Sequence, residues 1–128
     1  MLTIITANAP AAIGPYSQAI VSHGMVYTSG QIAIDPVTNT VKGQTIEEQT
    51  EQIMKNLAAI LEEANSGFHM AVKTTCFLAD MNDFAAFNEV YGRYFTSMPA
   101  RSCVAVKTLP KGVLAEVEVI AEISDYSY

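Results

Sequence analysis

Positive charge is scarce in this chain. Only 7 of its 128 residues are Lys or Arg, against 13 Asp and Glu, and the net charge is −6. Proteins that bind nucleic acid or anionic lipid without sequence specificity rely on clustered basic residues. The sequence contains no basic run. This composition argues against a nucleic-acid-binding or membrane-surface protein.

Long apolar stretches are also missing. No run approaches the roughly 20 apolar residues that span a bilayer. The first six residues lack the basic start and apolar core of a signal peptide, so we expect a cytoplasmic protein.

The composition is nevertheless apolar: 50% of the residues are hydrophobic and only 16% are charged, whereas about 25% is usual for charged residues. We therefore expect a well-filled core and a partner subunit over part of the apolar surface.

Residues for metal or thiol chemistry are few and scattered. The two cysteines, Cys76 and Cys103, and the two histidines, His23 and His69, show no metal-ligand spacing. One disulfide is arithmetically possible, but we expect buried free thiols in a cytoplasmic protein. The sequence has no Walker loop, dinucleotide fingerprint or serine-hydrolase elbow. The case for a zinc site from the sequence is therefore weak.

Hydrophobic periodicity predicts two helices and several strands. A capping-box pattern, Thr45 with Glu48, precedes the first apolar helical stripe. Asn82 or Asp83 is expected to cap the second helix. The expected strands are 17–22, 25–34, 71–79, 101–107 and 113–123, and the expected helices run to about 64 and 96. This order predicts one α+β domain over 1–128, a mixed sheet with both helices on one face. The other face would need cover from a dimer or trimer.

Arg101 opens an apolar run, 102–106, that is typical of a buried strand. A guanidinium in such a place is costly unless an anion accompanies it. Glu116 or Glu118 on a neighbouring strand could supply that anion. The alternative is the carboxylate of a small ligand, which the planar fork of Arg suits. The residues alone leave both readings open.

Three polar positions on or near these strands are further candidates. Glu116 and Glu118 share one strand face, which indicates either a solvated face or a general base beside an apolar cavity. Asn88 lies on the apolar stripe of the second helix and needs a partner. We expect its amide to bond to a neighbouring loop.

Three further residues are candidates with weaker signals. Tyr16 follows a turn at Gly14-Pro15, where it would bury its ring and expose its hydroxyl. Gly30 lies within a predicted strand, which permits close approach of a ligand or another chain. Cys103 shares a strand face with Arg101 but has no His nearby in the sequence. It is therefore expected to be a core or site-lining thiol rather than a nucleophile.

Several segments, in the same order and over nearly the whole chain, resemble the Rid family (YjgF/YER057c/UK114). They are Ala9-Pro10-Ala11-Ala12-Ile13-Gly14-Pro15-Tyr16-Ser17-Gln18-Ala19, Thr28-Ser29-Gly30-Gln31-Ile32, Asn82-Asp83-Phe84, Phe87-Asn88-Glu89-Val90-Tyr91, Pro99-Ala100-Arg101-Ser102-Cys103-Val104, Leu109-Pro110-Lys111 and Glu116-Val117-Glu118-Val119-Ile120-Ala121. The presence of both the arginine and the first glutamate resembles the RidA subgroup.

The resemblance implies a chorismate-mutase-like (ferredoxin-like) α+β fold and a homotrimer with three clefts between neighbouring subunits. It also implies a cofactor-independent enamine/imine deaminase. Such proteins hydrolyse reactive intermediates such as 2-aminoacrylate, which pyridoxal-phosphate enzymes release. The products are a 2-keto acid and ammonia.

The resemblance also implies roles for individual residues. Arg101 would hold the substrate carboxylate, Glu116 would activate the attacking water, and Tyr16 would line the cleft and assist through its hydroxyl. Substrate-binding or supporting roles would fall to three others: Gly30, Asn88 and Cys103. The connection 96–98 is shorter than in several family members, and it borders the cleft, so it bears on the size of substrate admitted.

Two other functions remain open at this point. A trimer that binds 2-keto acids or related metabolites without turnover would use the same Arg101. A ribonuclease activity has been attached to the family, but the acidic charge and the lack of a basic, aromatic surface weigh against it.

Overall fold

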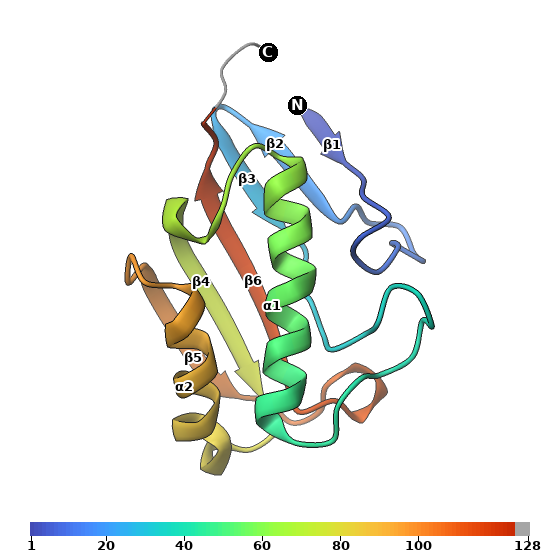
Figure 1. The fold of residues 1–128 in the computed structure, drawn as a ribbon, viewed down its shortest axis with the longest axis vertical. Helices are drawn as coiled ribbons and strands as arrows, with labels where there is room; N and C mark the ends of the chain where they lie inside the picture. The colour runs from blue at the N-terminus through green and yellow to red at the C-terminus, as the bar shows by residue number, and fades with distance from the viewer. Residues whose placement is uncertain (125–128) are drawn as a thin grey trace.

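The computed structural model describes residues 1–124, in which a six-stranded mixed sheet carries two α-helices on one face (Figure 1). The strand order is β1-β2-β3-β6-β4-β5. Among the strands of residues 1–124, only β4 and β5 pair in parallel. This confirms the predicted α+β arrangement. The bounds are β1 Leu2–Ile4, β2 Ala19–Ser22, β3 Met25–Thr28, α1 Ile46–Glu63, β4 Ala71–Leu78, α2 Phe84–Tyr94, β5 Ala100–Ala105 and β6 Ala115–Glu122.

Helix α1 begins where the sequence predicted. The Thr45 side chain accepts a hydrogen bond from the Glu48 backbone N–H, and the Glu48 side chain accepts one from the Thr45 N–H. This reciprocal capping satisfies two donors that the first turn leaves free. Neither α1 nor α2, the α-helices of the described residues, has the apolar length that a bilayer crossing demands.

The side chains of strand β6 alternate between the face of the sheet that the helices cover and the helix-free face. Ala115, Val117 and Val119 are buried against the helices, whereas Glu116 and Glu118 are partly exposed on the helix-free face. Alternate side chains of a strand point to opposite faces, so the predicted pattern of this strand is confirmed. The glutamates consequently lie on the far side of the sheet from both helices.

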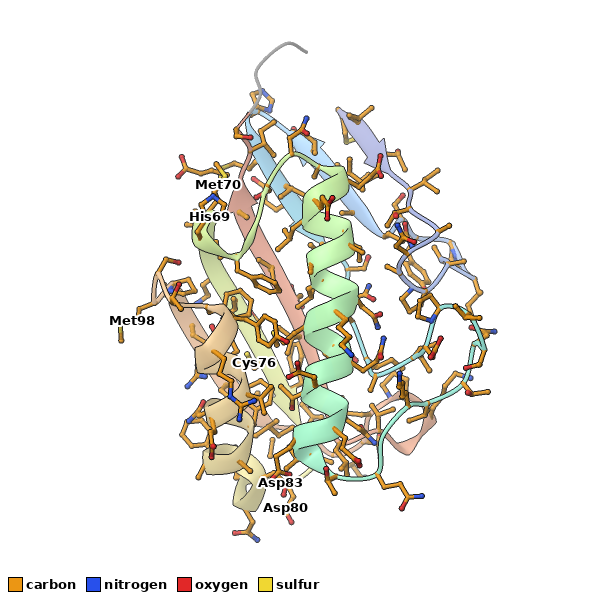
Figure 2. All side chains as sticks on the ribbon, in the orientation of Figure 1. His69, Met70, Cys76, Asp80, Asp83 and Met98 are labelled. Carbon is orange, nitrogen blue, oxygen red and sulfur yellow. The ribbon has the colours of Figure 1, made fainter. Side chains whose placement is uncertain are left out.

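The structure departs from the predicted strands in two places. Strand β1 was not expected, because a run of three residues, of which only Ile4 is buried, is too short to show an alternation. The strand expected over 25–34 ends at Thr28, and beyond it Gln31 alone bridges to Val117. The second helix, α2, has Asp83 at its N-cap position, one of the two residues expected there, although the Asp83 side chain makes no capping hydrogen bond. A 3₁₀ turn, Met81–Asp83, precedes α2, and its cap Asp80 accepts from the Asn82 N–H. Figure 2 places Asp80 and Asp83 at the start of α2. Residues 125–128 of the predicted domain lie outside the described part of the chain.

Candidate active site

Arg101 lies on β5, which is a mostly exposed edge strand, so the buried strand predicted here was wrong. The Arg101 side chain faces the helix layer. It is the register partner of Thr74 on the parallel neighbour β4, and Thr74 is fully buried under the helices. Register partners in a parallel pair point to the same face. Arg101 is therefore on the opposite face of the sheet from Glu116 and Glu118.

The Arg101 guanidinium is held by three side chains of α2. Its Nη1 donates a hydrogen bond to Asn88 Oδ1 at 2.7 Å. Its central carbon lies 4.8 Å from the centroid of the Tyr91 ring and 5.4 Å from that of Phe84. A cation over an aromatic face is stabilised by the ring quadrupole. The prediction that the Asn88 amide bonds to a neighbouring loop was wrong, because its oxygen accepts the hydrogen bond from Arg101.

No carboxylate within residues 1–124 forms an ion pair with Arg101; the ion pairs of this part are Lys42–Asp35 and Arg93–Glu89. Glu116 and Glu118 cannot reach it, because the sheet lies between them. The internal ion pair considered from the sequence is therefore excluded for the two named glutamates. One amide oxygen and two ring faces leave most of the guanidinium's donors available.

The ring beneath Arg101 is itself fixed. The Tyr91 hydroxyl is hydrogen-bonded to the buried Thr74 hydroxyl at 2.7 Å, and the Tyr91 ring stacks on Phe95 with centroids 4.5 Å apart. Burial raises the pKa of the Tyr91 phenol, so the hydroxyl remains protonated at neutral pH. The sequence analysis did not predict that Phe84 and Tyr91 contact Arg101, because it assigned both only to the core. The sequence feature that pointed to this face of α2 was the polar Asn88 on the same apolar stripe.

Glu116 lies directly against the backbone of Gly30. A Cβ added to Gly30 would stand 2.1 Å from Glu116 Oε2 and 2.9 Å from Glu116 Cδ, so only glycine leaves room for this carboxylate. The close approach anticipated at Gly30 is thus made by a side chain of the same chain. Burial, and secondarily the charge of Glu118, raise the pKa of Glu116.

A local break in the sheet places Gly30 there. Tyr27 pairs with Ile120, but Gln31 pairs with Val117, so one extra residue has been accommodated between these two positions. The Thr28 hydroxyl accepts the Val119 N–H at 3.0 Å and satisfies a donor that the interrupted ladder leaves free. Such irregularities redirect side chains and backbone next to sites.

Tyr16 and Gly30 share a hollow with Glu116 on the helix-free side. Its volume is about 330 Å³, and such a size is at the lower end for small-molecule sites. Tyr16 is 53% exposed, so the expectation that its ring would be buried was wrong. A separate hollow contains Arg101 and Asn88. The described chain thus gathers the candidate residues into two groups that do not meet.

Cys103 is in register with Cys76, and both are free thiols. Cys76 lies on β4 in the space covered by the helices (Figure 2). Burial raises the pKa of Cys76 to about 12 and also raises that of Cys103. Both thiols are therefore protonated at neutral pH, which does not suit a nucleophile. Within residues 1–124, no three His, Cys, Asp or Glu side chains cluster as metal ligands.

Comparison with known proteins identifies the family. The model of the endoribonuclease L-PSP family matches residues 6–123. The chain belongs to this family, also called the YjgF or Rid family. The resemblance drawn from the sequence motifs is confirmed.

Relatives of the Rid family carry different names. A Lactococcus lactis protein named as a candidate regulator, AldR, is 52% identical over 96% of this chain and 98% of its own. The mouse protein named 2-iminobutanoate/2-iminopropanoate deaminase is 47% identical over 92% of this chain and 88% of its own. Among solved structures, a candidate endoribonuclease from Thermotoga maritima has a TM-score of 0.94 and 48% identity, covering 98% of this chain and 99% of that one.

Proposed function

We propose that this Rid-family protein hydrolyses enamine and imine intermediates, such as 2-aminoacrylate and its tautomer 2-iminopropanoate, to 2-keto acids and ammonia. The observation that carries the proposal is the state of Arg101. Its guanidinium is oriented by Asn88 and two aromatic rings, yet no carboxylate of residues 1–124 neutralises it. A substrate carboxylate is the anion that this arrangement lacks. The deaminase name of the mouse relative supports this reaction.

In the proposed reaction, Arg101 holds the substrate carboxylate and Glu116 accepts a proton from the attacking water. The water oxygen bonds to the imine carbon, and the C=N bond opens to a carbinolamine. Glu116 returns that proton to the nitrogen, then takes the proton of the carbinolamine hydroxyl and passes it to the amino group; the C–N bond breaks, ammonia leaves, and the C=O bond of the keto acid forms. The raised pKa of Glu116 makes it a better proton acceptor than an exposed glutamate.

Supporting roles complete the proposed site. Tyr16 lines the cleft and offers its hydroxyl to the reacting nitrogen or water. Gly30 leaves space for the Glu116 carboxylate and, with Cys103, offers backbone groups to the substrate. Because an imine carbon is already electrophilic, positioning and one activated water suffice without a cofactor.

The proposal places the site between subunits of a homotrimer. Arg101 and Glu116 lie on opposite faces of one sheet, so two chains are needed to bring them together. The helix-free face has no layer over it within the described residues, and Tyr27 and Val104 on it are 44% and 47% exposed. A neighbouring copy on this face would cover these side chains.

The direct test adds the purified protein to a dehydratase that releases 2-aminoacrylate and follows pyruvate and ammonia. The wild-type protein is expected to accelerate both. Arg101→Ala is expected to lose at least about 30-fold in kcat/KM, corresponding to about 2 kcal/mol of lost charge-assisted binding. Arg93→Ala, on the exposed surface of α2, is the matched control and should keep full activity. The proposal fails if the wild-type protein gives no acceleration over buffer.

Metabolite binding without turnover is the second candidate, favoured by the name of the Lactococcus lactis relative. Calorimetry with 2-oxobutanoate beside the turnover assay separates the two functions. Arg101-dependent binding with no acceleration of hydrolysis would favour the binding protein.

A further inference from the structure

Gly92, in the last turn of α2, has no structural reason to be glycine. Its φ is not among the positive values of the described glycines, which belong to Gly24, Gly43 and Gly112. A Cβ added at Gly92 would meet nothing within 4 Å. Alanine at an exposed helical position is more favourable than glycine by about 1 kcal/mol. The chain thus carries a destabilising residue that neither conformation nor packing requires, and such exceptions concentrate at functional sites.

Gly92 instead borders the hollow that contains Arg101. It lies one helical turn after Asn88, the hydrogen-bond partner of Arg101, on the same side of α2. The hollow has a volume of about 540 Å³, within the range of small-molecule sites. Because Gly92 lacks a side chain, this wall of the hollow stays open next to the guanidinium.

The remaining walls are mainly apolar. Tyr91 comes from α2 and Phe95 is the C-cap residue of that helix, while Met98 and Pro99 come from the connection to β5. Met98 is 86% exposed and has a φ of 55°, a backbone conformation that non-glycine residues seldom adopt. Figure 2 shows its side chain projecting from this connection beyond the strands. An apolar wall and an exposed methionine beside a single unneutralised cation favour a ligand with an anionic head and a sizeable apolar tail.

We propose that this hollow is a subsite for the substrate side chain and that Gly92 sets the size it admits. The inference rests on the proposed function, because it takes the carboxylate at Arg101 as the anchor. From there the carbon chain runs past Gly92 toward Phe95 and Met98. The substrate class then extends from 2-iminopropanoate to 2-imino acids with branched or aromatic side chains, such as those of leucine and phenylalanine.

The test compares imines generated in place by an L-amino-acid oxidase from alanine, leucine and phenylalanine. The measured quantity is the ratio of kcat/KM for the leucine- or phenylalanine-derived imine to that for the alanine-derived imine. Gly92→Leu fills the hollow and is expected to lower this ratio at least about tenfold, as the loss of space for a few methylenes predicts. Gly92→Ala should raise the melting temperature and lower the ratio less. Ala85→Leu, on an exposed position of α2 outside the hollow, should leave the ratio unchanged.

An unchanged ratio in Gly92→Leu would overturn the subsite. An equal loss of kcat/KM on all three imines would give that result, because it leaves the ratio unchanged. If the wild-type protein hydrolyses no imine, the proposed function fails but the subsite is still tested. The readout is then the ratio of calorimetric affinities for 4-methyl-2-oxopentanoate and pyruvate. Gly92→Leu is again expected to lower that ratio, and no change in it would contradict the inference.

Discussion

At the scale of single residues, the Glu116 carboxylate occupies the space that a Cβ at position 30 would fill. The position of the carboxylate depends on the missing Cβ of Gly30. Because the atoms that a Cβ would displace are at the far end of a flexible side chain, the fold can accommodate an alanine there. The carboxylate cannot stay in place at the same time.

We therefore predict that Gly30→Ala keeps the melting temperature close to that of the wild-type protein while kcat falls by about 100-fold. A displacement of about 1 Å in a catalytic group has that effect. Thermal unfolding and turnover on the same preparation check this. Equal loss of stability and activity would instead indicate a structural role for Gly30.

The environment of Glu116 also predicts the pH dependence of turnover. Burial and Glu118 raise its pKa above the ordinary value of 4.5, so Glu116 takes up its proton at a higher pH than an exposed glutamate. A protonated carboxyl cannot act as a base. As the pH falls, kcat/KM should therefore decline at a pH above 4.5.

Glu118→Gln removes the charge that contributes to this shift, and it should move the acidic decline of kcat/KM to lower pH. The matched comparison is Glu122→Gln on the same strand, which leaves Glu118 in place and should not move the decline. If the wild-type protein and Glu118→Gln had identical pH profiles of kcat/KM, the acidic decline would not be due to protonation of Glu116.

At the scale of secondary-structure elements, α2 and β4 are joined by one buried hydrogen bond, between Thr74 and Tyr91. Removing the Thr74 hydroxyl leaves the Tyr91 hydroxyl unpaired in a buried place, and removing the Tyr91 hydroxyl leaves Thr74 only the weak contact with the Cys76 thiol. Removing both hydroxyls leaves no unpaired hydroxyl. We predict that Thr74→Val and Tyr91→Phe each lower the free energy of unfolding by about 1–2 kcal/mol.

The double variant should then be more stable than the sum of the two losses predicts. Urea denaturation of the four proteins measures this coupling. Strict additivity would mean that the two hydroxyls do not depend on each other, and the fixed ring beneath Arg101 would lose its support.

The elements that the sequence predicted best are those with a strong period. The capping box of Thr45 and Glu48 located the start of α1, and the alternation of β6 assigned Glu116 to its face. Strand β1 and the break at Gly30 escaped prediction because pairing partners far along the chain determine them. The same holds for Arg101. Its strand was predicted, but its contacts with Tyr91 and Asn88 could not be, because they depend on how α2 crosses β4 and β5.

At the scale of the whole molecule, the six-stranded sheet lies between Arg101 and Glu116. The sequence offered both residues as candidates but could not show that one sheet keeps them apart. Their separation is the physical reason to propose that neighbouring copies complete the site, with Arg101 from one chain and Glu116 from the next.

Complementation between two inactive variants tests this claim most directly. Arg101→Ala and Glu116→Gln are each predicted to be inactive as homotrimers. Co-expressed with different affinity tags, they are expected to form mixed copies of the proposed trimer, which two-step purification isolates. Around a ring of three, every mixed trimer has one interface where an intact Arg101 meets an intact Glu116, so about one third of wild-type activity should return. Mixed trimers as inactive as the parent variants would contradict a site shared between chains.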